Sequence, residues 1–223
     1  MNYRIALDGP SGAGKSTIAK RLSAELGFVY VDTGAMYRTI GLYCLENNIE
    51  LTNEKAVSAA LKDIDIQLKY LNGEQTIFLN GKDVSKDIRI NNVSMAASKV
   101  SAYKAVRAFL LQTQRDMAKT QSVIMDGRDI GTVVLPDAEI KIFIVADPKE
   151  RAKRRHKELL ERGQQISFEE VLQDIVARDY NDEHRKEAPL KQADDAQLID
   201  TSDMNFEQAY NAVLQTAKNK MKD

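Results

Sequence analysis

A glycine-rich stretch near the start of the chain has the residue types and spacing of a phosphate-binding loop. Gly9, Gly14, Lys15 and Ser16 satisfy the pattern G-x-x-x-x-G-K-[ST]. Glycines let the backbone wrap an anion with its N–H groups pointing inward, and a helix that begins near Lys15 adds the positive end of its dipole. We therefore expect this stretch to bind a nucleoside triphosphate. Its residues are Gly9, Pro10, Ser11, Gly12, Ala13, Gly14, Lys15, Ser16 and Thr17.

Two side chains of this loop have specific expected roles. Lys15 would reach the β- and γ-phosphates, and the Ser16 hydroxyl would ligate an Mg²⁺ ion that arrives bound to ATP. Asp126 is a candidate outer-shell partner of this ion, whereas Asp8, just before the loop, is expected to be structural. The two histidines, His156 and His184, belong to no cluster of ligands, so we expect neither to bind a metal.

The rest of the chain favours phosphoryl transfer over signalling or hydrolysis. A signalling GTPase would need a base-reading N-K-x-D, and the nearest string, NKMKD, has the wrong spacing. A remodelling ATPase usually carries Asp-Glu at its second acidic strand, but this strand ends MDGRD. Arginines stand instead where a second anion could bind. They are Arg38, Arg107, Arg128, Arg178 and Arg185.

Short β-rich runs alternate with longer segments of helical period along most of the chain. The expected strands cover residues 3–7, 28–31, 122–125, 140–145 and 197–199. Buried, nearly continuous apolar strands interleaved with helices indicate a parallel sheet covered on both faces. The expected fold class is therefore α/β, with a parallel sheet of the P-loop NTPase type flanked by helices.

One segment, residues 64–84, breaks this alternation. It contains two Asn-Gly turns between alternating apolar and polar residues, which is a strong hairpin signal. We therefore expect a small inserted α+β unit at residues 34–104, and a core domain formed by residues 1–33 and 105–223.

Composition limits the remaining classes of function. The net charge is −1 and charged residues make up 29% of the chain, which argues against a general nucleic-acid or membrane-surface binder. The single cysteine, Cys44, cannot form an internal disulfide, which favours a reducing compartment. The chain shows no apolar core of a signal peptide and no run near the roughly 20 apolar residues of a membrane span. We expect a cytoplasmic monomer with neither nucleic-acid nor membrane partners.

Four motifs together resemble the bacterial cytidylate kinases, a family of nucleoside monophosphate kinases. They are GPSGAGKST, VDTGAMYR (31–38), MDGRDIGTVVLPDA (125–138) and RDYNDEHR (178–185), which occur in order over nearly the whole chain. The resemblance implies transfer of the ATP γ-phosphoryl group to CMP or dCMP, giving CDP or dCDP plus ADP. It also implies that the insertion is a monophosphate-binding domain, and that a short mobile lid lies within about residues 149–166.

The acceptor site is expected to contact phosphate, base and ribose. Arg38 and Arg128 follow strand ends, where ligands bind in open α/β folds, and each can hold a phosphate with a bidentate fork. By resemblance, Asp129, Ser98 and Arg107 would recognise cytosine. The full set of expected CMP-binding residues is Thr33, Arg38, Ser98, Arg107, Arg128, Asp129, Arg178, Asp182 and Arg185.

Two helical segments complete the expected site. The motif RDYNDEHR ends a helix whose start is marked by the capping box SFEE, and the spacing places Arg178, Asp182 and Arg185 on one face. The basic run at residues 149–157 is typical of a lid whose arginines neutralise charge on the transferred group. Arg151 and Arg155 are the first candidates for this role and Arg154 is the next. The expected catalytic residues are Lys15, Arg128, Arg178, Arg185, Arg151 and Arg155.

Two alternatives stay open at this point. One is a P-loop kinase of another small phosphorylated acceptor, and the other is a P-loop hydrolytic switch. A panel of acceptors separates them, because a switch would cleave ATP without any acceptor.

Overall fold

The computed structural model describes residues 2–71 and 74–222. The chain forms two compact units. The first, which we call the core unit, consists of Met1–Val31 and Arg115–Asp223. The second, which we call the insert unit, is Asp32–Gln114. The assignment of residues 34–104 as a monophosphate-binding domain stays a prediction.

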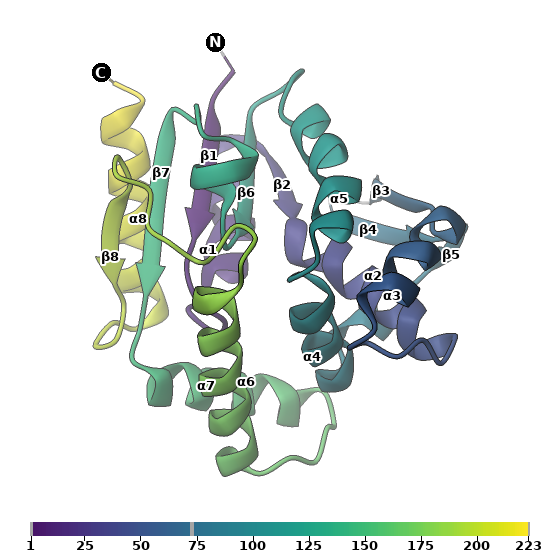
Figure 1. Cartoon of the computed structure of the whole chain (residues 1–223). Helices are drawn as coiled ribbons and strands as arrows, with labels where there is room; N and C mark the ends of the chain where they lie inside the picture. The colour runs from purple at the N-terminus through teal and green to yellow at the C-terminus, as the bar shows by residue number, and fades with distance from the viewer. Residues whose placement is uncertain (1, 72–73, 223) are drawn as a thin grey trace. The chain divides into compact units, whose positions relative to one another are not determined.

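A five-stranded sheet lies at the centre of the core unit, in the order β2-β6-β1-β7-β8 (Figure 1). The strands are β1 (Arg4–Asp8), β2 (Val29–Asp32), β6 (Val123–Gly127), β7 (Ile140–Val145) and β8 (Gln197–Asp200). β1 pairs in parallel with β6 and with β7, and β7 pairs in parallel with β8. Every residue of β6 is buried, which is typical of a parallel strand covered on both faces. The expected α/β class is confirmed.

Helices pack against this sheet through apolar side chains. α1 (Lys15–Leu26) and α8 (Phe206–Lys220) share a buried cluster with β1 and β7 that includes Ile18, Leu22 and Tyr210. α6 (Pro148–Glu161) and α7 (Phe168–His184) form a second cluster with each other. In Figure 1, α6 and α7 lie beyond the ends toward which the arrows of β1 and β7 point. A single π-helical turn, η3 (Ile130–Val134), follows β6.

The capping box predicted at the start of α7 is present. Ser167 accepts from the backbone N–H of Glu170, and the Glu170 carboxylate accepts from the backbone N–H of Ser167. The end of α7 differs from the expectation, because the helix stops at His184. Arg185 is the C-cap. Its N–H still donates to the Asn181 carbonyl and its φ of −63° is helical, so its side chain leaves the helix end beside Asp182, at 3.8 Å, and only the chain after it turns away (ψ 142°).

The insert unit combines helices with a three-stranded antiparallel sheet in the order β3-β4-β5. Its apolar core draws on α2 and α4, with Met36, Ile40, Val93 and Val100 fully buried. Its elements are α2 (Thr33–Glu46), α3 (Glu54–Ala60), η1 (Leu61–Asp63), β3 (Ile66–Leu71), β4 (Glu74–Leu79), β5 (Lys82–Asp83), η2 (Asp87–Arg89), α4 (Asn91–Val100) and α5 (Lys104–Met117), of which α5 continues into the core unit.

One of the two predicted hairpin turns lies between β4 and β5. Asn80 and Gly81 both have positive φ values, 49° and 82°, as a two-residue turn with a primed geometry requires. The other predicted turn, Asn72-Gly73, lies outside the described residues. Across residues 2–71 and 74–222, no helix has the length and apolar character needed to span a bilayer.

Candidate functional site

The loop between β1 and α1 depends on glycines with positive φ. Gly9, Gly12 and Gly14 have φ values of 145°, 76° and 87°. A side chain at Gly9 would collide with the carbonyl oxygen of Ile144, so only glycine fits there. Gly14 is the N-cap of α1 and offers no side chain to the first N–H groups of the helix. These N–H groups remain available to an anion, as a phosphate-binding loop requires.

Lys15 is folded back over this loop. Its Nζ atom donates to the Pro10 carbonyl at 2.7 Å, and the residue is only 5% exposed. Burial lowers the pKa of the Lys15 ammonium well below its usual value, and the nearby charge of Arg128 lowers it further. The ammonium group is therefore poorly solvated and would gain from an anionic ligand in the loop.

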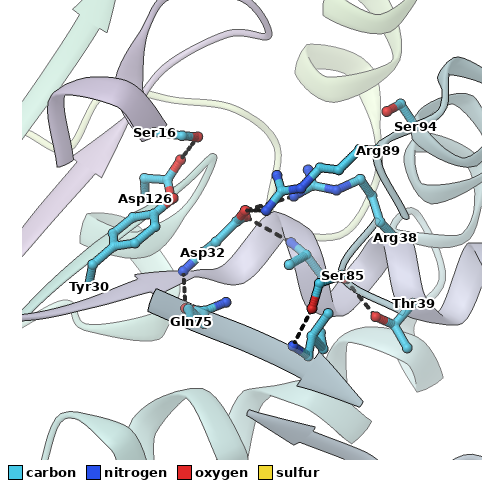
Figure 2. A network of polar contacts seen from close by, with 12 residues as sticks. Ser16, Tyr30, Asp32, Arg38, Thr39, Gln75, Ser85, Arg89, Ser94 and Asp126 are labelled. Atoms are coloured by element: carbon cyan, nitrogen blue, oxygen red, sulfur yellow. Dashed lines mark hydrogen bonds and ion pairs between the residues drawn. The ribbon is translucent and has the colours of Figure 1, made fainter. Parts of the chain in front are cut away.

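A carboxylate from the neighbouring strand lies beside Ser16 (Figure 2). Ser16 Oγ donates to Asp126 Oδ2 at 2.6 Å, and the Tyr30 hydroxyl donates to Asp126 Oδ1 at 2.9 Å. A hydroxyl and a carboxylate held together in this way are hard oxygen donors of the kind that Mg²⁺ prefers. The residues fit a hydrated Mg²⁺ ion held at Ser16.

Arginine and aspartate side chains form a buried cluster after β6 and at the end of α7. Arg128 Nε donates to Asp182 Oδ2 at 2.8 Å, and Arg185 lies 3.8 Å from the other oxygen of Asp182. Arg185 also pairs with Asp129 at 3.5 Å. We call these four residues the core arginine cluster. It brings together side chains that the sequence predicted for the acceptor site.

Several positive charges surround Asp182 within this cluster. Burial alone would raise the pKa of Asp182, but Arg128, Arg178 and Arg185 hold it below its usual value. Asp182 is therefore ionised at neutral pH. The charge on Arg178 also lowers the pKa of Lys15, so Arg178 acts electrostatically on both the cluster and the phosphate loop.

The loop after α7 also holds Arg185, in addition to the bond from its N–H to the Asn181 carbonyl. Its Nε atom donates to the Ala188 carbonyl at 2.8 Å, and Ala188 has a positive φ of 46°. Helical periodicity predicted that Arg178 and Asp182 share a face. It could not predict this turn, because contacts beyond the helix fix the turn. One of these contacts joins the Leu190 N–H to the Asp182 carbonyl at 2.7 Å.

The arginines of the basic run on α6 differ in their contacts. Arg151 is buried, donates to both carboxylate oxygens of Asp179 and also donates to the Ser11 carbonyl at 3.0 Å. Arg154 donates to the carbonyl of Thr201 at 2.7 Å. Arg155 pairs with Glu158 at 2.9 Å, and 19% of its side chain is exposed. The Arg151 guanidinium is therefore held against the phosphate loop, and its role as a lid residue stays a prediction.

The insert unit carries a second arginine cluster around one carboxylate (Figure 2). Asp32 Oδ1 accepts from the N–H of Ala35 at 2.8 Å and thereby caps α2. Its other oxygen lies 2.8 Å from Arg38 and 3.0 Å from Arg89. Burial would raise the pKa of Asp32, but Arg38 and Arg89 lower it to about 2. We call these three charged residues the insert arginine cluster.

Arg89 is a residue that the sequence analysis missed. It ends η2, and about a third of its side chain is exposed. No motif marks it, and its sequence neighbours Ile88 and Ile90 only indicate an apolar run. Only the tertiary structure identifies Arg89 as a candidate site residue, because the fold brings it to Asp32 and Arg38.

Three further predicted residues lie in the insert unit. Ser98 is buried in α4, and its hydroxyl has no hydrogen-bond partner among the described residues. Thr33 is the buried first residue of α2. Arg107 on α5 lies over the ring of Tyr37, with 5.6 Å between the guanidinium carbon and the ring centre. A buried hydroxyl without a partner costs free energy, which is consistent with a ligand that completes it.

Comparison with known proteins shows the family that the chain resembles. The family model described as cytidylate kinase matches residues 5–219. A cytidylate kinase from Thermosipho melanesiensis is 49% identical over 222 residues, covering all of both chains. One from Caldicellulosiruptor saccharolyticus is 50% identical over 211 residues, covering 95% of this chain and 93% of that protein.

Solved structures with much lower identity share the fold. A shikimate kinase from Bacteroides thetaiotaomicron has a TM-score of 0.50 at 13% identity, and the match covers 99% of both chains. A gluconokinase from Sinorhizobium meliloti has the same TM-score at 13% identity, covering 99% of this chain and 94% of that one. At such identity the likeness concerns the fold alone.

Proposed function

Because the chain belongs to the cytidylate kinase family of ATP-dependent phosphotransferases, we propose that it transfers the γ-phosphoryl group of ATP to CMP or dCMP. The products are CDP or dCDP and ADP. The observation that carries this proposal is the glycine loop with the buried Lys15, present in the same unit as the core arginine cluster. We further propose that it acts in the cytoplasm as a monomer.

ATP binds through the loop from Gly9 to Thr17. The backbone N–H groups and the N-terminus of α1 receive the phosphates, and Lys15 exchanges the Pro10 carbonyl for phosphate oxygens. Ser16 would hold Mg²⁺ directly, and Asp126, which accepts from Ser16, would hold it through water. The bound ion would neutralise charge on the β- and γ-phosphates.

Guanidinium groups hold the acceptor phosphate. Those predicted for this role are Arg38, Arg128, Arg178 and Arg185, and we add Arg89 because it shares Asp32 with Arg38. Planar guanidinium groups bind phosphate through paired N–H bonds, which a lysine cannot reproduce. Asp182 and Asp32 keep these arginines oriented before the substrate arrives.

Arg89 has a direct test within this scheme. Arg89→Ala should raise KM for CMP while leaving KM for ATP near its original value, because only an acceptor-phosphate contact is lost. Lys86→Ala is the matched control, since Lys86 is an exposed cation in the same segment. Equal KM values for CMP in both variants would remove Arg89 from the acceptor site.

Cytosine is recognised by Asp129, Ser98 and Arg107. Cytosine presents an amino donor beside an acceptor nitrogen, so a carboxylate and a donor together complement it, whereas the same carboxylate opposes a carbonyl of uracil. The unpartnered hydroxyl of Ser98 supports this role. Thr33 contributes its hydroxyl to the same substrate, and Asp182 accepts from a ribose hydroxyl.

Transfer is in line, with no covalent intermediate on the protein. The acceptor phosphate is already ionised and acts as its own nucleophile, so the site needs no strong base. Lys15, Arg128, Arg178 and Arg185 stabilise the charge that spreads over the transferred group. Arg155 is the lid residue that reaches this charge, and Arg151 contributes by holding the phosphate loop through Ser11.

A panel of acceptors tests the activity. The protein is incubated with MgATP and with CMP, dCMP, UMP, AMP, GMP or no acceptor, and ADP is measured. We expect rapid ADP formation with CMP and dCMP. Preference for another acceptor would support a different small-molecule kinase, and ADP formation without an acceptor would support a hydrolytic switch.

A further inference from the structure

Asp8 joins the phosphate loop to the segment that carries Asp129. It is the last residue of β1, directly before Gly9, and is only 5% exposed. Its Oδ1 atom accepts from the backbone N–H of Ile130 at 2.8 Å, and its Oδ2 atom accepts from the N–H of Gly131 at 2.7 Å. One carboxylate therefore receives two consecutive N–H groups from a distant part of the chain.

These two N–H groups belong to the first residues of η3. The first N–H groups of any helix have no partner within it, and buried ones need an acceptor from elsewhere. Ile130 is 1% exposed, and a side chain at Gly131 would stand 3.4 Å from Asp8 Oδ2 and 3.1 Å from Lys141. The turn is therefore closely packed against Asp8. A single π-helical turn is also an uncommon feature that is often found at functional sites.

The position of Asp129 follows from this contact, because Asp129 directly precedes Ile130. Its backbone carbonyl accepts from Val133 and Val134 at the start of the same turn. Its carboxylate lies 3.5 Å from Arg185. A shift of η3 away from Asp8 would move the Asp129 side chain relative to Arg185.

We propose that Asp8 is a positioning residue for base selection, which fixes Asp129 at the edge of the sheet where the phosphate loop begins. This inference rests on the proposed role of Asp129 in recognising cytosine. Asp8 acts on Asp129 through the backbone of Ile130 and Gly131, and its charge also acts on Lys15 of the phosphate loop. Asp8 also directly precedes the phosphate loop. Its two hydrogen bonds therefore fix the position of the segment that carries Asp129 relative to that loop.

The ionisation of Asp8 is consistent with this geometry. Burial raises the pKa of Asp8 to about 6, and the N–H groups of Gly131 and Ile130 partly offset that rise. At pH 8 the carboxylate is ionised, so both oxygens accept. An asparagine at this position would keep one acceptor and turn an NH₂ group toward the second N–H.

The variant Asp8→Asn tests the proposal at pH 8, with steady-state kinetics for CMP, UMP and ATP. We expect the ratio of kcat/KM for CMP to that for UMP to fall about fivefold or more, because a buried N–H loses its charged acceptor. KM for ATP also responds to the charge that Asp8 presents to Lys15, so the readout is the ratio for the two acceptors, in which an effect common to both cancels. The control is Asp200→Asn, which removes an exposed carboxylate at the end of β8 that accepts from the Ser202 N–H. This control should leave the ratio unchanged.

Two further variants separate the possible failures. If Asp129→Ala lowers the ratio and Asp8→Asn does not, the inference about Asp8 is wrong and the role of Asp129 stands. If neither variant changes the ratio, the proposed role of Asp129 fails. In the double variant, Asp8→Asn should add no further loss of selectivity to Asp129→Ala, and an additive loss would contradict an action through Asp129.

Gly131→Ala provides the test if Asp8→Asn does not fold, as judged by its circular dichroism melt. The added methyl group would stand 3.1 Å from the Lys141 side chain. Because Lys141 Nζ is held by the Pro136 carbonyl and Asp195, we expect the turn to shift by a few tenths of an ångström while the Asp8 carboxylate stays in place. We expect the same fall in selectivity. An unchanged ratio in a folded Gly131→Ala protein would overturn the proposal.

Discussion

At the scale of single residues, the site depends on charges that are buried before any substrate binds. Lys15 is held by one hydrogen bond to the Pro10 carbonyl, and Asp182 is held among three arginines. Such charges stabilise a transition state effectively once substrates are bound and Lys15 has exchanged the Pro10 carbonyl for phosphate oxygens. Their removal should therefore affect turnover more than folding.

The first prediction concerns Lys15→Ala. We expect kcat to fall by a factor of about 10² to 10³ or more, because the ammonium group stabilises charge on the transferred phosphoryl group. The melting temperature should change little, since Lys15 contributes a single hydrogen bond to the loop. Lys20→Ala, at an exposed position of the same helix, is the control. Near-normal turnover of a folded Lys15→Ala protein would refute the role given to the loop.

The second prediction concerns Asp182→Ala. If Asp182 accepts from a ribose hydroxyl, CMP loses a contact that dCMP lacks, in addition to the disordering of Arg128 that affects both substrates. We expect kcat/KM to fall further for CMP than for dCMP, by the roughly 1–3 kcal/mol of a hydrogen bond to a charged, desolvated group. Folding damage cancels in the ratio of the two acceptors measured on one preparation. Equal losses would limit Asp182 to orienting the arginines.

At the scale of elements, Asp32 links the start of α2 to the insert arginine cluster. The third prediction is a pH dependence of stability. The pKa of Asp32 is about 2 in the folded protein, below the roughly 3.9 of a free aspartate. Its stabilising contribution is therefore complete above about pH 4 and is lost as the pH falls toward 2.

The variant Asp32→Asn isolates this contribution, because other carboxylates titrate equally in both proteins. Asparagine can still cap α2 but carries no charge for Arg38 and Arg89. The free energy of unfolding is measured with urea between pH 2 and pH 6. Above pH 4 it should be larger for the original protein than for Asp32→Asn, and the difference between the two proteins should decrease as the pH falls. A difference that stays constant over this range would contradict the assignment.

Elements whose signals are local could be predicted from the sequence. The hairpin turn at Asn80-Gly81 and the capping box from Ser167 to Glu170 depend on residues only a few positions apart. The end of α7 was placed one residue too late, because Arg185 bonds to Ala188 in the following loop. A contact between a helix end and the loop after it does not change the periodicity of the sequence, so the periodicity cannot predict it.

The same limit applies to the site. Helical spacing predicted that Arg178 and Asp182 share a face, but the contact between Arg128 and Asp182 joins residues 54 positions apart. The basic run on α6 predicted a lid, yet the partner of Arg151 is Asp179 on α7. Arg89 was missed for the same reason. The predicted family and fold class are confirmed, and the roles of the individual site residues stay predictions.

At the scale of the whole molecule, a chain with a net charge of −1 is proposed to bind two anionic substrates. Groups of arginines account for this, because Arg38 and Arg89 gather around Asp32, and Arg128, Arg178 and Arg185 gather around Asp182. Positive charge is therefore concentrated locally while the molecule as a whole stays nearly neutral. A nearly neutral surface also gives little general attraction for nucleic acid.

The fate of the γ-phosphoryl group tests the central claim most directly. The protein is incubated with γ-labelled ATP, Mg²⁺ and CMP, and the labelled products are separated over the first turnovers. We predict that the label appears in the β-position of CDP, with one CDP formed for each ADP, and that neither labelled inorganic phosphate nor labelled protein accumulates. Label released as inorganic phosphate, or retained on the protein as a covalent intermediate, would contradict direct transfer to CMP.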